Sequence, residues 1–109
     1  TITSEANVTA IGKSTFFGCA SLQRFIIPST VTTIGENAFS GCASLTQISI
    51  PRSVTTIENY AFSNCSALRK IIAPTGIKSI GDGAFSLCPN IQGVARQSLG
   101  SRFGSQIFD

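Results

Sequence analysis

The chain has 109 residues, of which 42% are hydrophobic and only 12% are charged, and its formal net charge is +3. The charged fraction is about half that of an average domain, so the surface must be mostly neutral and polar. A nucleic-acid-binding surface needs clustered Lys and Arg, and a membrane-spanning helix needs about 18 consecutive apolar residues. Neither feature is present, so we expect no nucleic-acid partner and no membrane insertion in this segment.

A 23-residue repeat organises the chain, and the stretch VTTIGENAFSGCASLTQISIPRS at 31–53 represents one full unit. We predict a single repeat domain over 1–109. Its pieces are a partial unit at 1–7, full units at 8–30, 31–53, 54–76 and 77–99, and a degenerate half-unit at 100–109. The chain opens inside a strand position and contains no Met, which indicates a mature chain or a fragment of a longer one.

Each full unit divides into three predicted elements. In 31–53, the β-branched residues of 31–35 predict a short extended segment. The polar start of 36–42 predicts one helical or 3-10 turn. Glu36, or Ser14 and Asp82 in the first and fourth units, is placed to cap it. A half-buried strand follows at 45–51, because apolar and polar residues alternate there before a proline. In the fourth unit Gln97 replaces that proline.

One unit cannot bury its apolar face alone, so the units must stack. A phenylalanine recurs at the same position of every full unit, and this recurrence predicts an aromatic ladder through the stack. The ladder consists of Phe16, Phe39, Phe62 and Phe85.

The combined pattern L-x-x-I-x-I-P-x-x-V-T-x-I-G-x-x-A-F-x-x-C-x-x-L resembles the BspA-like leucine-rich repeat, in full units over 8–99. The resemblance implies an α/β leucine-rich-repeat solenoid that is right-handed, with a parallel β-sheet on the concave side and short extended segments and helical turns elsewhere. It also implies a cell-surface or secreted protein that works in adhesion or protein recognition, with no catalytic residue in the pattern. Glu58 in place of Gly and Thr15 in place of Ala depart from it.

Four cysteines recur at the 23-residue interval, at Cys19, Cys42, Cys65 and Cys88. Zinc sites use close Cys pairs, often with His, and a Cys nucleophile uses a neighbouring base; the chain has no His. Stacked residues of a parallel sheet lie about 4.8 Å apart with parallel Cβ vectors, whereas a disulfide needs converging Cβ atoms about 3.8 Å apart. We therefore expect four free thiols that act as small hydrophobic side chains, and no metal or cofactor.

Two glutamates, Glu36 and Glu58, fall near one repeat position. Capping of the turn is the favoured interpretation. A carboxylate pair for acid–base catalysis is conceivable, but the sequence supplies no nucleophile or substrate pocket beside it. The segment IGKST at 11–15 lacks the first glycine of a phosphate-binding loop, because Asn7 stands there. We therefore expect no enzyme activity.

The remaining candidates are outward-facing residues of the strands equivalent to 45–51. Ile26 and Ile72 are apolar at positions expected to face solvent, and Arg and Lys residues stand beside them. Such a mixture suits a recognition patch, although two isoleucines also raise strand propensity without any function. The predicted ligand-binding residues of the concave face, called the strand face below, are Arg24, Ile26, Gln47, Ser49, Arg69, Lys70 and Ile72.

The leading hypothesis is a protein-recognition or adhesion module of a cell-surface or secreted protein, whose ligand is another protein such as a host or matrix protein. The alternative is a structural spacer, or a terminal section of a longer repeat array. An uncovered first unit would also permit an end-to-end homodimer.

Overall fold

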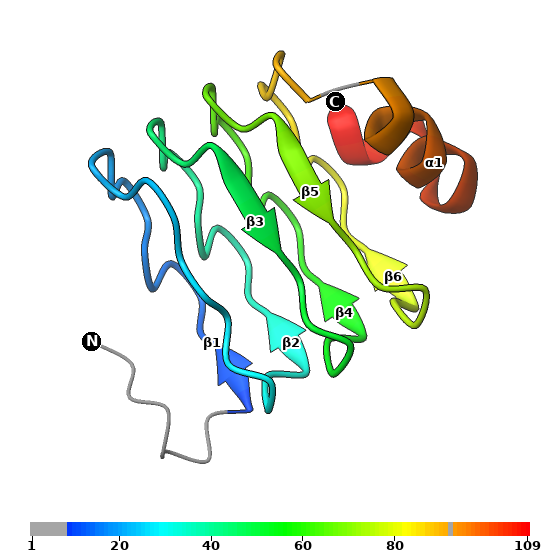
Figure 1. The fold of residues 1–109 in the computed structure, drawn as a ribbon, viewed down its shortest axis with the longest axis horizontal. Helices are drawn as coiled ribbons and strands as arrows, with labels where there is room; N and C mark the ends of the chain where they lie inside the picture. Colours follow the sequence, from blue (N-terminus) through cyan, green and yellow to red (C-terminus); the bar gives the residue numbers. More distant parts are fainter. Residues whose placement is uncertain (1–8, 92) are drawn as a thin grey trace.

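The chain winds through successive loops of similar shape that stack along one direction, and a helical segment follows the last of them (Figure 1). The computed structural model describes residues 9–91 and 93–109, so the partial unit predicted at 1–7 lies outside the described residues. The elements are β1 (Ala10–Ile11), β2 (Thr33–Ile34), β3 (Gln47–Ser49), β4 (Thr56–Ile57), β5 (Lys70–Ile72), β6 (Ser79–Ile80), α1 (Gly93–Phe103) and the 3-10 helix η1 (Ser105–Phe108).

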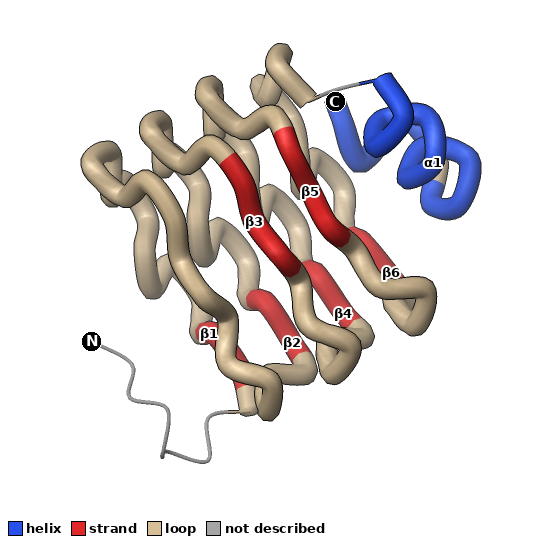
Figure 2. The backbone as a smooth tube through the Cα atoms, viewed as in Figure 1, coloured by secondary structure: helices blue, strands red, loops and turns tan. Residues whose placement is uncertain are grey.

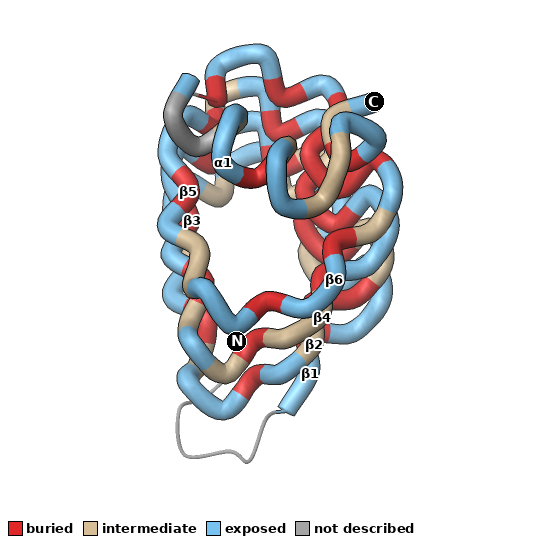
Figure 3. The backbone as a smooth tube through the Cα atoms, turned by 90° about the vertical axis from the view of Figure 1, so that its right-hand side faces the viewer, coloured by how far each residue is buried: buried red, intermediate tan, exposed pale blue. Residues whose placement is uncertain are grey.

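The strands form two parallel sheets that stand as opposite walls of the stack (Figures 2 and 3). One sheet has the order β1-β2-β4-β6, and the other pairs β3 with β5. Paired residues of neighbouring strands are one 23-residue repeat apart, for example Ile34 with Ile57 and Ile48 with Ile71. The parallel sheet of short strands expected from the sequence is confirmed. The larger sheet, however, is built by the segments equivalent to 31–35. The segments equivalent to 45–51 form only the two strands β3 and β5 and one isolated bridge, Ile26 to Ser49.

Apolar side chains fill the space between the two walls. In β3 and β5 the central isoleucine is buried and its neighbours are exposed, as the alternation of the sequence predicts. The central units contribute the same set of buried side chains, for example Ile34, Phe39, Cys42 and Leu45 in the unit 31–53, all with 0% exposure. Stacking therefore creates one continuous core.

The aromatic ladder is confirmed. The rings of Phe39 and Phe62 lie 5.0 Å apart and 3° from parallel, and those of Phe62 and Phe85 lie 5.3 Å apart at 4°. Phe16 stacks on Phe39 at 5.2 Å and 13°. Because the central rings are fully buried, the ladder is a large apolar contribution to the free energy of folding.

The turn at 36–42 differs from the helical or 3-10 turn that the sequence predicts. Only alternate N–H groups bond within the turn: Ala38 donates to Gly35 at 3.1 Å. The intervening N–H of Phe39 donates instead to Ala61 of the next unit, at 2.7 Å. A helix would use all these donors internally. Two left-handed residues per unit, such as Asn37 at φ 58° and Gly41 at φ 79°, produce this alternation.

The expected capping by carboxylates is also not found among the described residues. Glu36 instead forms an ion pair with Lys13, at 3.7 Å. The backbone N–H of Asp82 donates to the side-chain oxygen of Asn59 at 2.9 Å, so an amide of the preceding unit fulfils the role predicted for an acid.

The fourth unit departs most from the predicted pattern, because α1 begins at Gly93 where the repeat register places a strand. The segment lacks the Ile-x-Ile-Pro pattern, and Ala, Arg, Gln and Leu within it favour a helix. The predicted boundary between 99 and 100 falls inside α1. The chain then rejoins the stack at η1, where the N–H of Phe85 donates to the oxygen of Ile107 at 2.8 Å.

Candidate functional site

All seven residues of the strand face are exposed. Ile26 exposes 87% of its surface and Ile72 exposes 51%, which confirms that both apolar side chains face solvent. The register places Gln47 beside Lys70 and Ser49 beside Ile72, and the bridge adds Ile26 on the other side of Ser49. The strand face is therefore one continuous surface that crosses three neighbouring units.

Part of this surface is hollowed. A shallow pocket of about 320 Å³ is lined by Arg24, Phe25, Ile26, Ile27, Gln47, Ser49 and Pro51. It brings four of the predicted residues together, whereas Arg69, Lys70 and Ile72 do not line it. The pocket combines apolar walls with one guanidinium group and two hydrogen-bonding side chains. That composition accepts an apolar side chain together with an acceptor group.

The strand face is also a region of uncompensated positive charge. Within residues 9–91 and 93–109, the one ion pair joins Lys13 and Glu36, and neither belongs to the strand face. Arg24, Arg69 and Lys70 thus carry three positive charges without a carboxylate partner in that part of the chain. Such a surface is complementary to an acidic partner.

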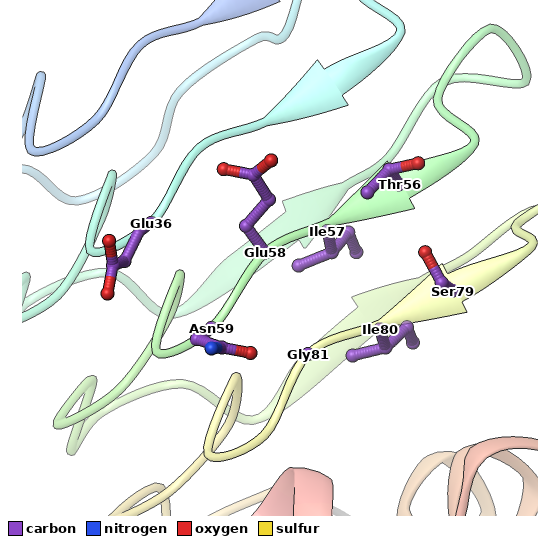
Figure 4. Close-up of a pocket in the computed structure, with 8 residues that line it drawn as sticks. All are labelled: Glu36, Thr56, Ile57, Glu58, Asn59, Ser79, Ile80 and Gly81. Carbon is purple, nitrogen blue, oxygen red and sulfur yellow. The ribbon is translucent and has the colours of Figure 1, made fainter.

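The two glutamates considered for acid–base chemistry do share a pocket, contrary to the expectation that none would be available. It holds about 350 Å³ on the wall opposite the strand face, and Figure 4 shows its lining residues Glu36, Thr56, Ile57, Glu58, Asn59, Ser79, Ile80 and Gly81. The two carboxylate groups do not converge on one point in this view. Among the described residues no hydroxyl of Thr56 or Ser79 bonds to either carboxylate, so the nucleophile–base pair that hydrolysis requires is not assembled.

The cysteines are free thiols, as predicted. Cys42, Cys65 and Cys88 are buried, and each donates from its sulfur to the Phe carbonyl of the preceding unit, at 3.3, 3.2 and 3.0 Å. Burial, with the nearby Cys19 thiol, raises the pKa of Cys42 to about 11. The neighbouring Cys88 thiol, together with burial, raises the pKa of Cys65 as well. The raised pKa values keep the thiols of Cys42 and Cys65 protonated, so these two are poor nucleophiles and poor metal ligands.

Two further observations limit the chemistry of the described part of the chain. It contains no cluster of three or more His, Cys, Asp or Glu side chains arranged to hold a metal ion. It also contains no helix that is long and apolar enough to cross a bilayer.

Comparison with known proteins identifies the repeat. The whole sequence, residues 1–109, matches the BspA type leucine rich repeat region in six copies. The chain belongs to the BspA-type leucine-rich repeat family. A leucine-rich repeat protein of T. pallidum is 37% identical with a TM-score of 0.75, over 77% of this chain and 39% of that one. One from Bacteroides ovatus is 30% identical with a TM-score of 0.77, over 90% of this chain and 27% of that one. No curated protein matches the chain.

This chain therefore spans less than half the length of either of these two solved proteins. Its fold is the leucine-rich repeat fold, with parallel sheets of short strands.

Sequence reasoning missed two features of the surface. The first is the pair of hydroxyl side chains, Thr56 and Ser79, beside the glutamates. The second is a pocket near α1 that Leu87 and Arg96 both line. Leu87 occupies the repeat position held by Gly18, Gly41 and Asn64 in the other units. That substitution of an apolar residue for Gly or Asn was a signal available in the sequence.

Proposed function

We propose that this chain is a protein-recognition module that binds an acidic, partly apolar segment of another protein through its strand face. The observation that carries the proposal is the exposure of Ile26 and Ile72 amid unpaired cations on the strand face. Repeat solenoids present extended binding surfaces of this kind. Exposed apolar groups next to arginine are typical of interface anchors. A non-catalytic role at the cell surface or in secretion belongs to this proposal, in line with the family.

The rigid strands give the proposed surface a physical advantage. Ile26, Ser49 and Ile72 follow one another at the spacing of neighbouring parallel strands, about 4.8 Å. The buried isoleucine at the centre of β3 and of β5 fixes the positions of Ser49 and Ile72, and the bridge to Ser49 positions Ile26, so binding costs little ordering of the backbone. A ligand peptide that lies across the strands meets an apolar side chain near each end and the polar Ser49 between them.

The apolar anchors can be tested without knowledge of the natural ligand. Peptides are selected from a random library on the immobilised chain, and their affinities are measured for the double variant Ile26→Ser, Ile72→Ser. Serine already occupies the equivalent position 49, so the fold should tolerate it. We expect selected peptides rich in Asp, Glu and apolar residues, and an affinity loss of about tenfold or more.

The matched control is Phe17→Ser, which removes an apolar side chain that is 60% exposed in the turn after β1. It should leave the affinity unchanged. Equal affinities of the wild-type chain and the double isoleucine variant would contradict the proposal, because the isoleucines would then serve strand formation alone.

A second candidate function is a spacer within a longer repeat array. The observation that favours it is the limited coverage of the two solved relatives, 39% and 27% of their chains. In that case the strand face would bind no selected peptide specifically.

A further inference from the structure

A third pocket lies at the C-terminal end of the stack, where the last turn meets α1 and η1. It holds about 430 Å³, and its lining includes Asn64, Ser66, Leu87, Pro89, Arg96 and Phe108. We call it the end pocket. None of these residues belongs to the strand face.

Arg96 supplies a fixed positive charge to the end pocket. One of its terminal nitrogens donates to the carbonyl oxygen of Cys88 at 3.0 Å, and its guanidinium carbon lies 4.4 Å from the centre of the Phe108 ring. These two contacts hold the planar group in place. In the described part of the chain Arg96 forms no ion pair. An oriented guanidinium with spare donors matches a carboxylate, which can accept two hydrogen bonds from it.

Leu87 supplies an apolar rim to the end pocket, from a backbone conformation that is unfavourable for leucine. Its side chain is 69% exposed, and its backbone lies in the left-handed region at φ 56°. A leucine is disfavoured there, whereas Gly and Asn adopt this conformation readily. Gly41 and Asn64 fill the same repeat position with φ 79° and 60°. Leucine at this position therefore costs stability and exposes apolar surface, and outliers of this kind concentrate at binding sites.

We propose that the end pocket binds a peptide segment of a protein partner in which a Glu or Asp side chain lies beside an apolar side chain. The carboxylate is received by Arg96, and the apolar neighbour packs on Leu87, Pro89 and the edge of Phe108. Asn64 and Ser66, both exposed at the same pocket, offer hydrogen bonds to the peptide backbone. The charge complementarity selects an acidic partner, and the apolar rim selects against acidic groups without an apolar neighbour.

The probe is the capped peptide acetyl-Gly-Leu-Glu-Leu-Gly-amide, titrated into the ¹⁵N-labelled chain and followed by NMR. We expect saturable shifts at residues 64, 66, 87, 88, 96 and 108, with a Kd of about a millimolar. The isosteric peptide with Gln in place of Glu should bind about tenfold or more weakly. A third peptide, acetyl-Gly-Leu-Leu with a free carboxyl end, should also bind about tenfold more weakly. Equal binding of the Glu and Gln peptides, or preference for the free carboxyl end, would overturn the proposal.

The decisive variant is Leu87→Asn, because it separates binding from folding. Asn is similar in size and already stands at the equivalent position 64, so the melting temperature should stay the same or rise. The affinity for the Glu peptide should fall about tenfold. An unchanged affinity would contradict the proposal. The variant Arg24→Glu, Lys70→Glu, which alters only the strand face, should keep the peptide affinity that is read from the shifts at residues 87, 96 and 108, so failure of the two sites can be told apart.

Discussion

The ladder of phenylalanines is the feature whose removal should damage the fold most, and Phe62→Ala tests it at a central position. Phe62 is fully buried between two parallel rings, 5.0 Å from Phe39 and 5.3 Å from Phe85. Truncation leaves both neighbours facing a void that is too well enclosed to collapse freely. The change also leaves intact every backbone hydrogen bond between the units, so any loss reports on packing.

The expected magnitude follows from three contributions. Transfer of a fully buried Phe side chain contributes about 1.5–3 kcal/mol, and each stacked aromatic pair adds about 0.5–1.5 kcal/mol. Incomplete relaxation of the cavity adds to the loss, and Phe→Ala changes in cores cost about 3–5 kcal/mol. We therefore expect Phe62→Ala to lower the free energy of unfolding by about 3–5 kcal/mol. For a small domain of marginal stability this is a large part of the total.

Urea unfolding followed by circular dichroism measures this change, with Phe17→Ala as the matched control. Phe17 is 60% exposed and outside the ladder, so its truncation should change the free energy of unfolding by less than about 0.5 kcal/mol. A loss below about 1 kcal/mol for Phe62→Ala, or equal losses for the two variants, would refute the conclusion that the stacked rings stabilise the fold.

Three further predictions follow from close contacts and from the thiols. Gly35→Ala should cost about 1–3 kcal/mol of stability, because its Cβ would lie 2.8 Å from the oxygen of Ile11. The control Gly76→Ala, whose Cβ would have no atom within 4 Å, should be neutral or stabilising. Thermal melts of both variants measure the difference. Because the folded-state pKa of Cys42 is raised from 9.0 to about 11, the stability that Cys42 contributes is fully present below pH 9 and is lost between about pH 9 and pH 11, by at most about 1.4 kcal/mol per pH unit. Unfolding titrations over this range should show a flatter decline for Cys42→Ala, and an identical decline would contradict the assignment. A thiol assay after unfolding without reductant should find four free thiols, and fewer than two would contradict the structure.

The sequence predicts the interior of this molecule well because each repeat presents the same set of apolar residues that must be buried. Phe39, Cys42, Leu45 and Ile48 recur at fixed spacing, and only stacking buries such a set. All four are buried in the structure. Alternation along the 45–51 type of segment also assigns its outward positions correctly, including the exposed Ile26 and Ile72.

The end of the stack was harder to predict, because the repeat pattern weakens where α1 replaces a strand. Gln97 in place of proline removed one strand signal without specifying a helix. The left-handed positions were also missed. They are held by residues as different as Ser14, Asn37 and Tyr60, so no single residue type marks them. The resulting end pocket depends on the contact of Arg96 with Phe108, which no spacing in the sequence indicates.

The central claim is that the cations of the strand face contribute to ligand recognition, and charge reversal tests it most directly. The affinity of a library-selected peptide is measured by calorimetry for Arg24→Glu, Lys70→Glu and for the control Arg52→Glu, Lys78→Glu. The control changes the net charge equally at exposed residues outside the strand face. We predict a loss of about tenfold or more for the first variant only, with both melting temperatures unchanged. Unchanged binding by the first variant, or equal losses in both, would contradict the claim and favour the spacer function.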